Sequence, residues 1–151
     1  MTLLLDNDDL AQVLTAKDCI DVLDEAYRAY AMGHGVCAPR IDVQSAPLAP
    51  DKNYQLGYVA GMTGKYTALR IKADGVLQRV IDGAARKDKY CSRPGLYMGL
   101  ILLFDAADGR LLAILHDGLL QKMRVGADSA LGVRYMARAD AEVLGILGSG
   151  G

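Results

Sequence analysis

Apolar residues recur every three or four positions in the first quarter of the chain, a spacing that predicts helices. Asp8 to Leu14 forms one short helical pattern. Thr15 is followed three residues later by Asp18, an arrangement that resembles a capping box and opens a second helix. That helix is expected to end near Gly33. Its apolar stripe predicts an amphipathic helix that covers a core, and consists of Ile20, Leu23, Tyr27 and Tyr30.

The pattern then changes to the two-residue period of β-strands. Ile41–Gln44, within a proline-rich stretch, and Tyr54–Met62 are candidate strands. The alternation is clearest over Ala68–Asp74. Of its two faces, one holds Leu69, Ile71 and Ala73, and the other holds Arg70, Lys72 and Asp74. We expect the first face to pack and the second to carry charge.

The third quarter of the chain combines a region of unclear structure with a clear hairpin. Gly75 to Gly95 shows no firm periodicity, which predicts a functional or mobile surface loop. Leu96–Phe104 is continuously apolar, as is typical of a strand buried on both faces. Asp105 to Gly109 then forms a turn that leads into a second strand, Leu111–Leu115.

The last part of the chain predicts a helix, a strand and a glycine loop. Asp117 is expected to cap a helix that runs to about Ala137, and Glu142–Leu147 reads as the final strand. Gly148, Ser149 and Gly150 supply the first two glycines of a G-x-G-x-x-G dinucleotide-binding loop. The remainder of that motif lies beyond residue 151, and a flexible glycine-serine tail is the alternative interpretation.

Composition indicates a soluble α/β protein without bulk attraction to polyanions. The 151 residues suffice for one domain, and the net charge of −1 favours neither nucleic acid nor membrane partners. The longest apolar run is about half of what a membrane helix needs. The acidic N-terminus is unlike a secretory signal, so a cytoplasmic location is expected. The odd number of cysteines predicts reduced thiols, at Cys19, Cys37 and Cys91.

Three cations from separate elements are the candidates for chemistry. Arg40 follows a proline, Lys72 lies in the middle of a strand, and Arg124 lies in the first turns of the long helix, whose dipole favours anions. Together they are able to converge on one carboxylate. The alternative is that each is a solvated surface charge. His34 and His116 have no partners at ligand spacing, and no hydrolase or P-loop motif is present.

Several segments, in this order and spacing, resemble the ornithine cyclodeaminase and mu-crystallin family. They are Arg70-Ile-Lys-Ala-Asp74, Pro94-Gly-Leu-Tyr-Met-Gly-Leu-Ile-Leu-Leu-Phe-Asp105, Leu112-Ala-Ile-Leu-His-Asp-Gly118, Leu120-Gln-Lys-Met-Arg-Val-Gly-Ala127 and Gly148-Ser-Gly150. The resemblance implies an α/β fold in which an N-terminal α+β domain with a mixed sheet leads into a truncated Rossmann nucleotide-binding domain. The implied divisions are a substrate-binding and dimerisation domain over residues 1–117, a linking helix over 118–139, and the first Rossmann strand and glycine loop over 140–151.

The same resemblance implies roles for individual residues. Arg40, Lys72 and Arg124 match the positions that hold the substrate carboxylate, and Lys72 is the catalytic candidate, orienting the α-amine or transferring a proton. Gly148, Ser149 and Gly150 match the cofactor loop for NAD or NADP, which is bound mainly by residues beyond this sequence. The family's catalytic aspartate also belongs to that later part.

The implied activity is NAD(P)-dependent hydride transfer from an amino acid, followed by imine formation and loss of ammonia, in a homodimer. The alternatives are a net amino-acid dehydrogenase or ketimine reductase, and a non-catalytic ligand-binding protein like mu-crystallin. Two positions depart from the family pattern, because Gln121 and Val125 stand where threonines are typical. The amino-acid or imino-acid substrate is therefore left open.

Overall fold

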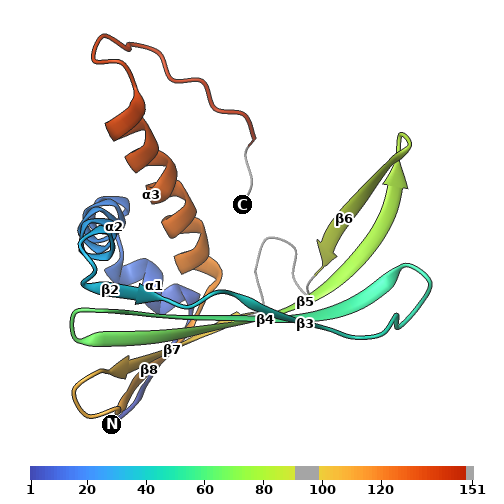
Figure 1. Ribbon diagram of the computed structural model, residues 1–151, viewed down its shortest axis with the longest axis horizontal. Coiled ribbons are helices and arrows are strands. Elements are labelled where there is room, and N and C mark those ends of the chain that lie inside the picture. The colour runs from blue at the N-terminus through green and yellow to red at the C-terminus, as the bar shows by residue number, and fades with distance from the viewer. Residues whose placement is uncertain (91–98, 149–151) are drawn as a thin grey trace.

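The protein folds as a mixed sheet with helices on one side, which confirms the expected α/β class (Figure 1). The computed structural model describes residues 1–90 and 99–148. The sheet has eight strands in the order β1-β8-β7-β5-β4-β2, with β3 paired to β4 and β6 paired to β5. The strands are β1 (Leu3–Leu5), β2 (Gly35–Cys37), β3 (Ile41–Gln44), β4 (Lys52–Thr63), β5 (Tyr66–Ile81), β6 (Ala84–Tyr90), β7 (Gly99–Asp105) and β8 (Leu111–His116).

Only the β1–β8 pair is parallel among the described strands, and this pair makes the sheet mixed. The predicted β7–β8 hairpin is confirmed. β1 and β2 were not predicted, because three-residue strands are too short to show a period. Both are instead defined by their longer neighbours, β8 and β4.

Three helices form where the sequence predicts them: α1 (Asn7–Val13), α2 (Ala16–Ala31) and α3 (Gly118–Met136). Capping boxes start the first two. Asp6 accepts hydrogen bonds from the amides of Asp8 and Asp9 at 2.8 and 2.9 Å. Thr15 and Asp18 satisfy each other's backbone amides at the start of α2. These reciprocal bonds fix where the helices begin.

The predicted surface loop over Gly75–Gly95 is wrong for its first sixteen residues. β5 continues to Ile81 and pairs with β6 in a hairpin that projects from the far end of the sheet (Figure 1). Asp82 and Gly83, with φ of 53° and 76°, form its turn. Asp-Gly is a favoured pair for tight hairpins because both positions need positive φ. Residues 91–95 lie outside the described part of the chain.

The alternation predicted for the centre of β5 is confirmed, but the burial of its two faces is the reverse of what we expected. Lys72 and Asp74, on the charged face, are buried, whereas Leu69, Ile71 and Ala73 of the apolar face are only half-buried. The helices lie on one side of the sheet (Figure 1). This side is the charged face, because Ala68, which shares the face of Lys72, lines a cavity together with residues of α2. Charged groups tolerate this burial because they pair with one another.

The opposite face of the sheet is apolar and has no covering layer of helices (Figure 1). Among its residues, Leu4 is 74% exposed, Val43 is 52% exposed and Leu100 is 42% exposed. The expectation that the strand Leu96–Phe104 is buried on both faces is therefore wrong for its described part, which begins at Gly99. A single layer of helices buries only one face of a sheet.

The predicted final strand, Glu142–Leu147, does not form. The described residues after α3 pair with no strand, and Val143, Ile146 and Leu147 are 91%, 76% and 104% exposed. An apolar run becomes a strand only where another strand accepts its backbone hydrogen bonds. No strand in the described part of the chain does so.

Candidate functional site

Lys72 is the central charged residue of the helix-covered face. Its side chain is 11% exposed, and Nζ lies 3.3 Å from Oδ2 of Asp74, two residues further along the same strand. Residues two apart in a strand point to the same face, so β5 itself sets this pair. The Asp74 side chain is 4% exposed. The ammonium group is therefore held in a mostly desolvated position by a carboxylate partner.

Arg40 lies just before β3, and β4 separates it from Lys72 in β5. Gly57 of β4 pairs with Lys72 of β5 and also with Asp42 of β3. A Cβ atom on Gly57 would lie 2.7 Å from Nη2 of Arg40 and 2.6 Å from Oδ1 of Asp42, so their side chains occupy the space above this glycine. Paired residues on neighbouring strands have Cα atoms about 5 Å apart. The structure thus brings the first two predicted site residues together.

Arg40 also has its own carboxylate partner. Its Nε and Nη2 atoms both lie 2.8 Å from Oδ1 of Asp42, and the two side chains are 43% and 36% exposed. This half-exposed pair is open to solvent, in contrast to Lys72. Arg40 is therefore the more solvent-accessible of the two cations.

On the other side of Lys72 lies a buried ion pair. Gly99 of β7 pairs with Lys72, and a Cβ on Gly99 would overlap the carboxylate of Asp117. Asp117 is fully buried, and its Oδ2 accepts from Nε and Nη2 of Arg70 at 2.9 and 2.7 Å. Its Oδ1 accepts no hydrogen bond from the described residues.

The prediction that Asp117 caps the long helix is therefore wrong. Asp117 occupies the N-cap position, but its side chain makes no capping hydrogen bond and turns to the sheet instead. Asn7 of α1 takes over that function, because its Oδ1 accepts from the amide of Leu119 at 2.9 Å. The Asp117 carboxylate thus forgoes a capping bond, which is worth about 1 kcal/mol, and pairs with Arg70 instead.

Arg124, the third predicted site residue, lies on α3. Its Nη1 is 2.7 Å from Oδ2 of Asp128, one turn later, and its side chain is 47% exposed. Tyr27 of α2 donates to Oδ1 of the same carboxylate at 2.7 Å. In the part of the chain that the structure describes, Arg124 forms no ion pair with the sheet. The described contacts of Arg124 and its partner Asp128 are thus with residues of α2 and α3, whereas those of Arg40 and Lys72 are with acidic residues of the sheet.

Each of the three candidate cations pairs with an acidic residue of its own segment, a feature that we did not predict. The spacing is two residues in the strands and four in the helix. These are the separations at which side chains share a face. The sequence patterns R-x-D, K-x-D and R-x-x-x-D could therefore have indicated these ion pairs. Their acidic partners are Asp42, Asp74 and Asp128.

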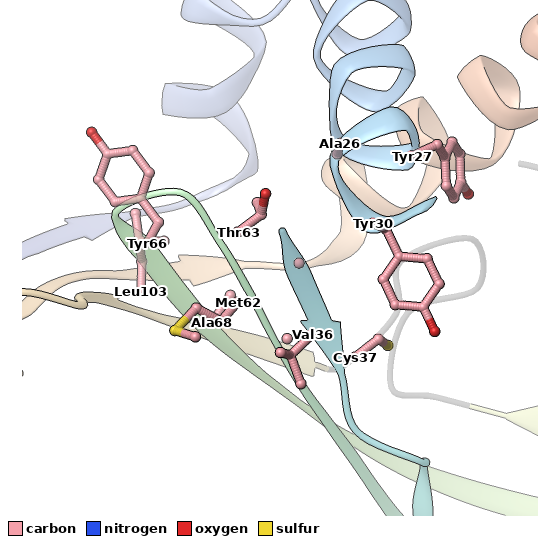
Figure 2. Close-up of a pocket in the computed structure, with 12 residues that line it drawn as sticks. Ala26, Tyr27, Tyr30, Val36, Cys37, Met62, Thr63, Tyr66, Ala68 and Leu103 are labelled. Carbon is pink, nitrogen blue, oxygen red and sulfur yellow. The ribbon is translucent and has the colours of Figure 1, made fainter. Parts of the chain in front are cut away.

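A separate apolar cavity of about 550 Å³ lies between α2 and the sheet (Figure 2). Tyr27 and Tyr30 line it from α2, and Val36 and Cys37 line it from β2 (Figure 2). The two tyrosines belong to the predicted apolar stripe, but they are 52% and 56% exposed. The stripe is thus only partly covered by the sheet.

Other predicted features have a smaller part in the site. Gly148 has φ of 96°, a conformation that suits a glycine turn, while Ser149 and Gly150 lie outside the described residues. Cys19 and Cys37 are free thiols, and Cys91 is not described. Within residues 1–90 and 99–148, no group of three metal-ligating side chains occurs. No described helix is long and apolar enough to cross a membrane.

A buried lysine and a half-exposed arginine, on either side of one glycine of the sheet, are groups suited to holding a small anion. Comparison with known proteins identifies the family. Residues 2–151 match the model of the ornithine cyclodeaminase/mu-crystallin family, and the chain belongs to that family. The resemblance found in the sequence is thereby confirmed.

Similar proteins include a dehydrogenase and a reductase. An alanine dehydrogenase of Archaeoglobus fulgidus is 23% identical over 153 residues, covering 99% of this chain and 41% of the relative. A Δ1-pyrroline-2-carboxylate reductase of Paracoccus denitrificans is 44% identical over 52 residues, 34% of this chain and 16% of the relative.

Solved structures show the same fold. The Δ1-pyrroline-2-carboxylate reductase of Thermococcus litoralis, in complex with NADH and L-proline, has a TM-score of 0.71 against this chain at 21% identity. The match covers 92% of this chain and 39% of that one. A probable ornithine cyclodeaminase of Bordetella pertussis has a TM-score of 0.69 at 21% identity, covering 91% and 37%. This chain therefore spans about two fifths of the length of these solved relatives.

Proposed function

We propose that this chain forms the substrate-binding part of an NAD(P)-dependent oxidoreductase that acts on an α-amino acid or the corresponding imine. The observation that carries the proposal is that the Arg40 side chain lies over Gly57, the residue of β4 that pairs with the buried Lys72. The names of the similar proteins support the reaction class, since they include reductases and dehydrogenases of amino and imino acids.

In this proposal Arg40 binds the substrate carboxylate. Its guanidinium offers paired donors that fit a carboxylate, and it is exposed enough to exchange Asp42 for a ligand. Arg124 supplies a second contact from α3, at the helix end whose dipole favours anions. Lys72 orients the nitrogen of the substrate or passes a proton to it, while Asp74 keeps the ammonium in place.

In the reductive direction, the proposed reaction converts an imine to an amine. The imine carbon gains a hydride, the imine nitrogen gains a proton, and the C=N double bond becomes a single bond. A nicotinamide cofactor, when bound, supplies or accepts the hydride. Gly148, with its positive φ, suits the glycine loop that such a cofactor requires, and Ser149 and Gly150 are proposed to complete it.

The second candidate is cyclodeamination of a diamino acid. In that reaction the hydride first leaves the α-carbon, the side-chain amine attacks the imine, ammonia departs, and the hydride returns. Its support is the set of structural neighbours that includes a probable ornithine cyclodeaminase and a lysine cyclodeaminase. With L-ornithine, release of ammonia without net formation of NADH distinguishes cyclodeamination from oxidation. Ligand binding without turnover would instead favour a mu-crystallin-like role.

The test of the carboxylate site is Arg40→Ala in the complete protein. We expect KM for Δ1-pyrroline-2-carboxylate, L-alanine or L-ornithine, whichever the wild type uses, to rise about 10- to 150-fold, because a charge-assisted contact contributes about 1.5–3 kcal/mol. Steady-state kinetics measure the change. Arg110→Ala is the control, since Arg110 is an exposed arginine in the β7–β8 turn. An unchanged KM in Arg40→Ala would remove Arg40 from the site.

We also propose that the complete protein is a homodimer joined through the uncovered apolar face of the sheet. Leu100→Glu is expected to shift it toward monomers, because a buried carboxylate without a partner opposes association. Light scattering at micromolar concentration measures the mass. Val22→Glu, on the exposed side of α2, is the control. A wild-type monomer, or a dimer unaffected by Leu100→Glu, would contradict this interface.

A further inference from the structure

We infer that Tyr27 and Asp128 are positioning residues for Arg124, and that the α2–α3 contact thereby sets the orientation of a substrate-binding arginine. This inference rests on the proposed function, which gives Arg124 a carboxylate to bind. It is carried by a chain of contacts between the two helices. Neither Tyr27 nor Asp128 is assigned a part in the chemistry.

The contacts divide the Asp128 carboxylate between two helices. Oδ2 lies 2.7 Å from Nη1 of Arg124 on α3, and Oδ1 accepts from the hydroxyl of Tyr27 on α2, also at 2.7 Å. The hydrogen bond to Asp128 raises the pKa of Tyr27, so the phenol stays protonated and keeps donating. Each oxygen therefore has one partner, and the carboxylate cannot rotate without losing a bond.

The hydrogen bond from Tyr27 to Asp128 matters because the ion pair between Asp128 and Arg124 is weak by itself. An exposed ion pair between residues four apart on a helix contributes about 0.3–0.5 kcal/mol, and leaves a long arginine side chain free to change rotamer. Asp128 is only 28% exposed, and the bond from Tyr27 ties it to a different element. Arg124 thus pairs with a fixed carboxylate instead of a mobile one. Removing the tyrosine hydroxyl should loosen Arg124 without changing any charge.

The same pair of helices contains a matched control. Tyr135 of α3 donates to Oδ2 of Asp24 on α2 at 2.7 Å, which mirrors the Tyr27–Asp128 bond with the helices exchanged. The arginines beside Asp24 are Arg28 and Arg134, which are 61% and 45% exposed and have no proposed part in binding. Tyr135→Phe therefore removes the corresponding α2–α3 hydrogen bond, together with the one that Arg28 donates to the same hydroxyl, and touches no contact of Arg124.

Tyr27 has a second contact that extends the inference. Tyr27 lines the apolar cavity between α2 and the sheet (Figure 2), and its hydroxyl donates to Oδ1 of Asp128. Tyr27, in the cavity wall, is thus linked to Arg124 through the Asp128 carboxylate. A shift of α2 across the cavity would be transmitted to Arg124 through these contacts.

The experiment compares Tyr27→Phe, Tyr135→Phe, Arg124→Ala and the Tyr27→Phe/Arg124→Ala double variant in the complete protein. The readouts are KM and kcat for the substrate that the wild type uses, with thermal midpoint as the measure of stability. We expect Arg124→Ala to raise KM about 10- to 150-fold. Tyr27→Phe should raise KM about 3- to 10-fold, with a smaller change in kcat. Tyr135→Phe should lower the thermal midpoint to a similar extent and leave KM unchanged.

The double variant supplies the decisive comparison. If Tyr27 acts through Arg124, Tyr27→Phe has no further effect on KM once Arg124 is alanine. Equal KM values in Tyr27→Phe and Tyr135→Phe, or independent effects in the double variant, would overturn the inference and leave the proposed function intact. An unchanged KM in Arg124→Ala would instead remove Arg124 from the proposed site, and the positioning role with it.

Discussion

Lys72→Met is expected to reduce kcat of the complete enzyme about 10²- to 10⁴-fold, the range that a positioned proton donor or acceptor contributes. Methionine nearly preserves the length of the lysine side chain and suits a position that is 11% exposed, so the loss of the ammonium group is the main change. Single-turnover measurements of hydride transfer, followed by NADH absorbance, separate this loss from weaker substrate binding.

Lys65→Met is the matched control for that substitution. Lys65 lies in the turn between β4 and β5, on the same hairpin as Lys72, and its ammonium group lies over the ring of Tyr66 instead of within the site. We expect wild-type kcat for this variant. If Lys72→Met retained most of the wild-type rate of hydride transfer, Lys72 would have only a structural role, as the ion-pair partner of the buried Asp74.

Arg70→Leu is expected to lower the free energy of unfolding of the 151-residue chain by about 3–5 kcal/mol. The reason is that Asp117 is fully buried and would lose both hydrogen bonds to its Oδ2. Its other oxygen accepts no bond from the described residues, so no second contact compensates there. Urea denaturation followed by circular dichroism measures the change.

A double replacement distinguishes the buried pair from simple loss of packing. Arg70→Leu with Asp117→Leu removes both charges, and we expect it to recover a substantial part of the lost stability, because no unpaired charge remains. Arg138→Leu, in the exposed Arg138–Asp140 pair, should leave the denaturation midpoint unchanged. Equal stability of wild type and Arg70→Leu would show that Asp117 finds another partner or takes up a proton.

Local signals in the sequence were enough to predict much of the fold. Thr15 with Asp18 correctly marked the start of α2, and the alternation around Lys72 correctly identified the centre of β5. Which face is buried was harder to predict, because alternation distinguishes the two faces of a strand but does not indicate which face the helices cover. The charged face was judged the exposed one on its composition alone, and ion pairing reversed that outcome.

The candidate site divides in a similar way. Arg40 and Lys72 were proposed separately, and only the strand register places them on either side of Gly57 in β4, because a register follows from pairing between segments far apart in sequence. Asp117 was misread because an aspartate before a helix is usually a cap, and its partner Arg70 is 47 residues earlier. The Asp82-Gly83 turn, by contrast, was readable and was overlooked within a stretch of mixed charge.

The two glycines beside Lys72 carry no chemistry, yet they limit how this sequence is able to diverge. At Gly57 a methyl group would displace the half-exposed ends of Arg40 and Asp42, which have room to swing outward. At Gly99 it would meet the fully buried carboxylate of Asp117, which has no such freedom. Descendants of this chain should therefore lose the glycine of β4 more readily than that of β7. Substitution of Gly57 would therefore change the affinity for a ligand while the charges of the site remain the same.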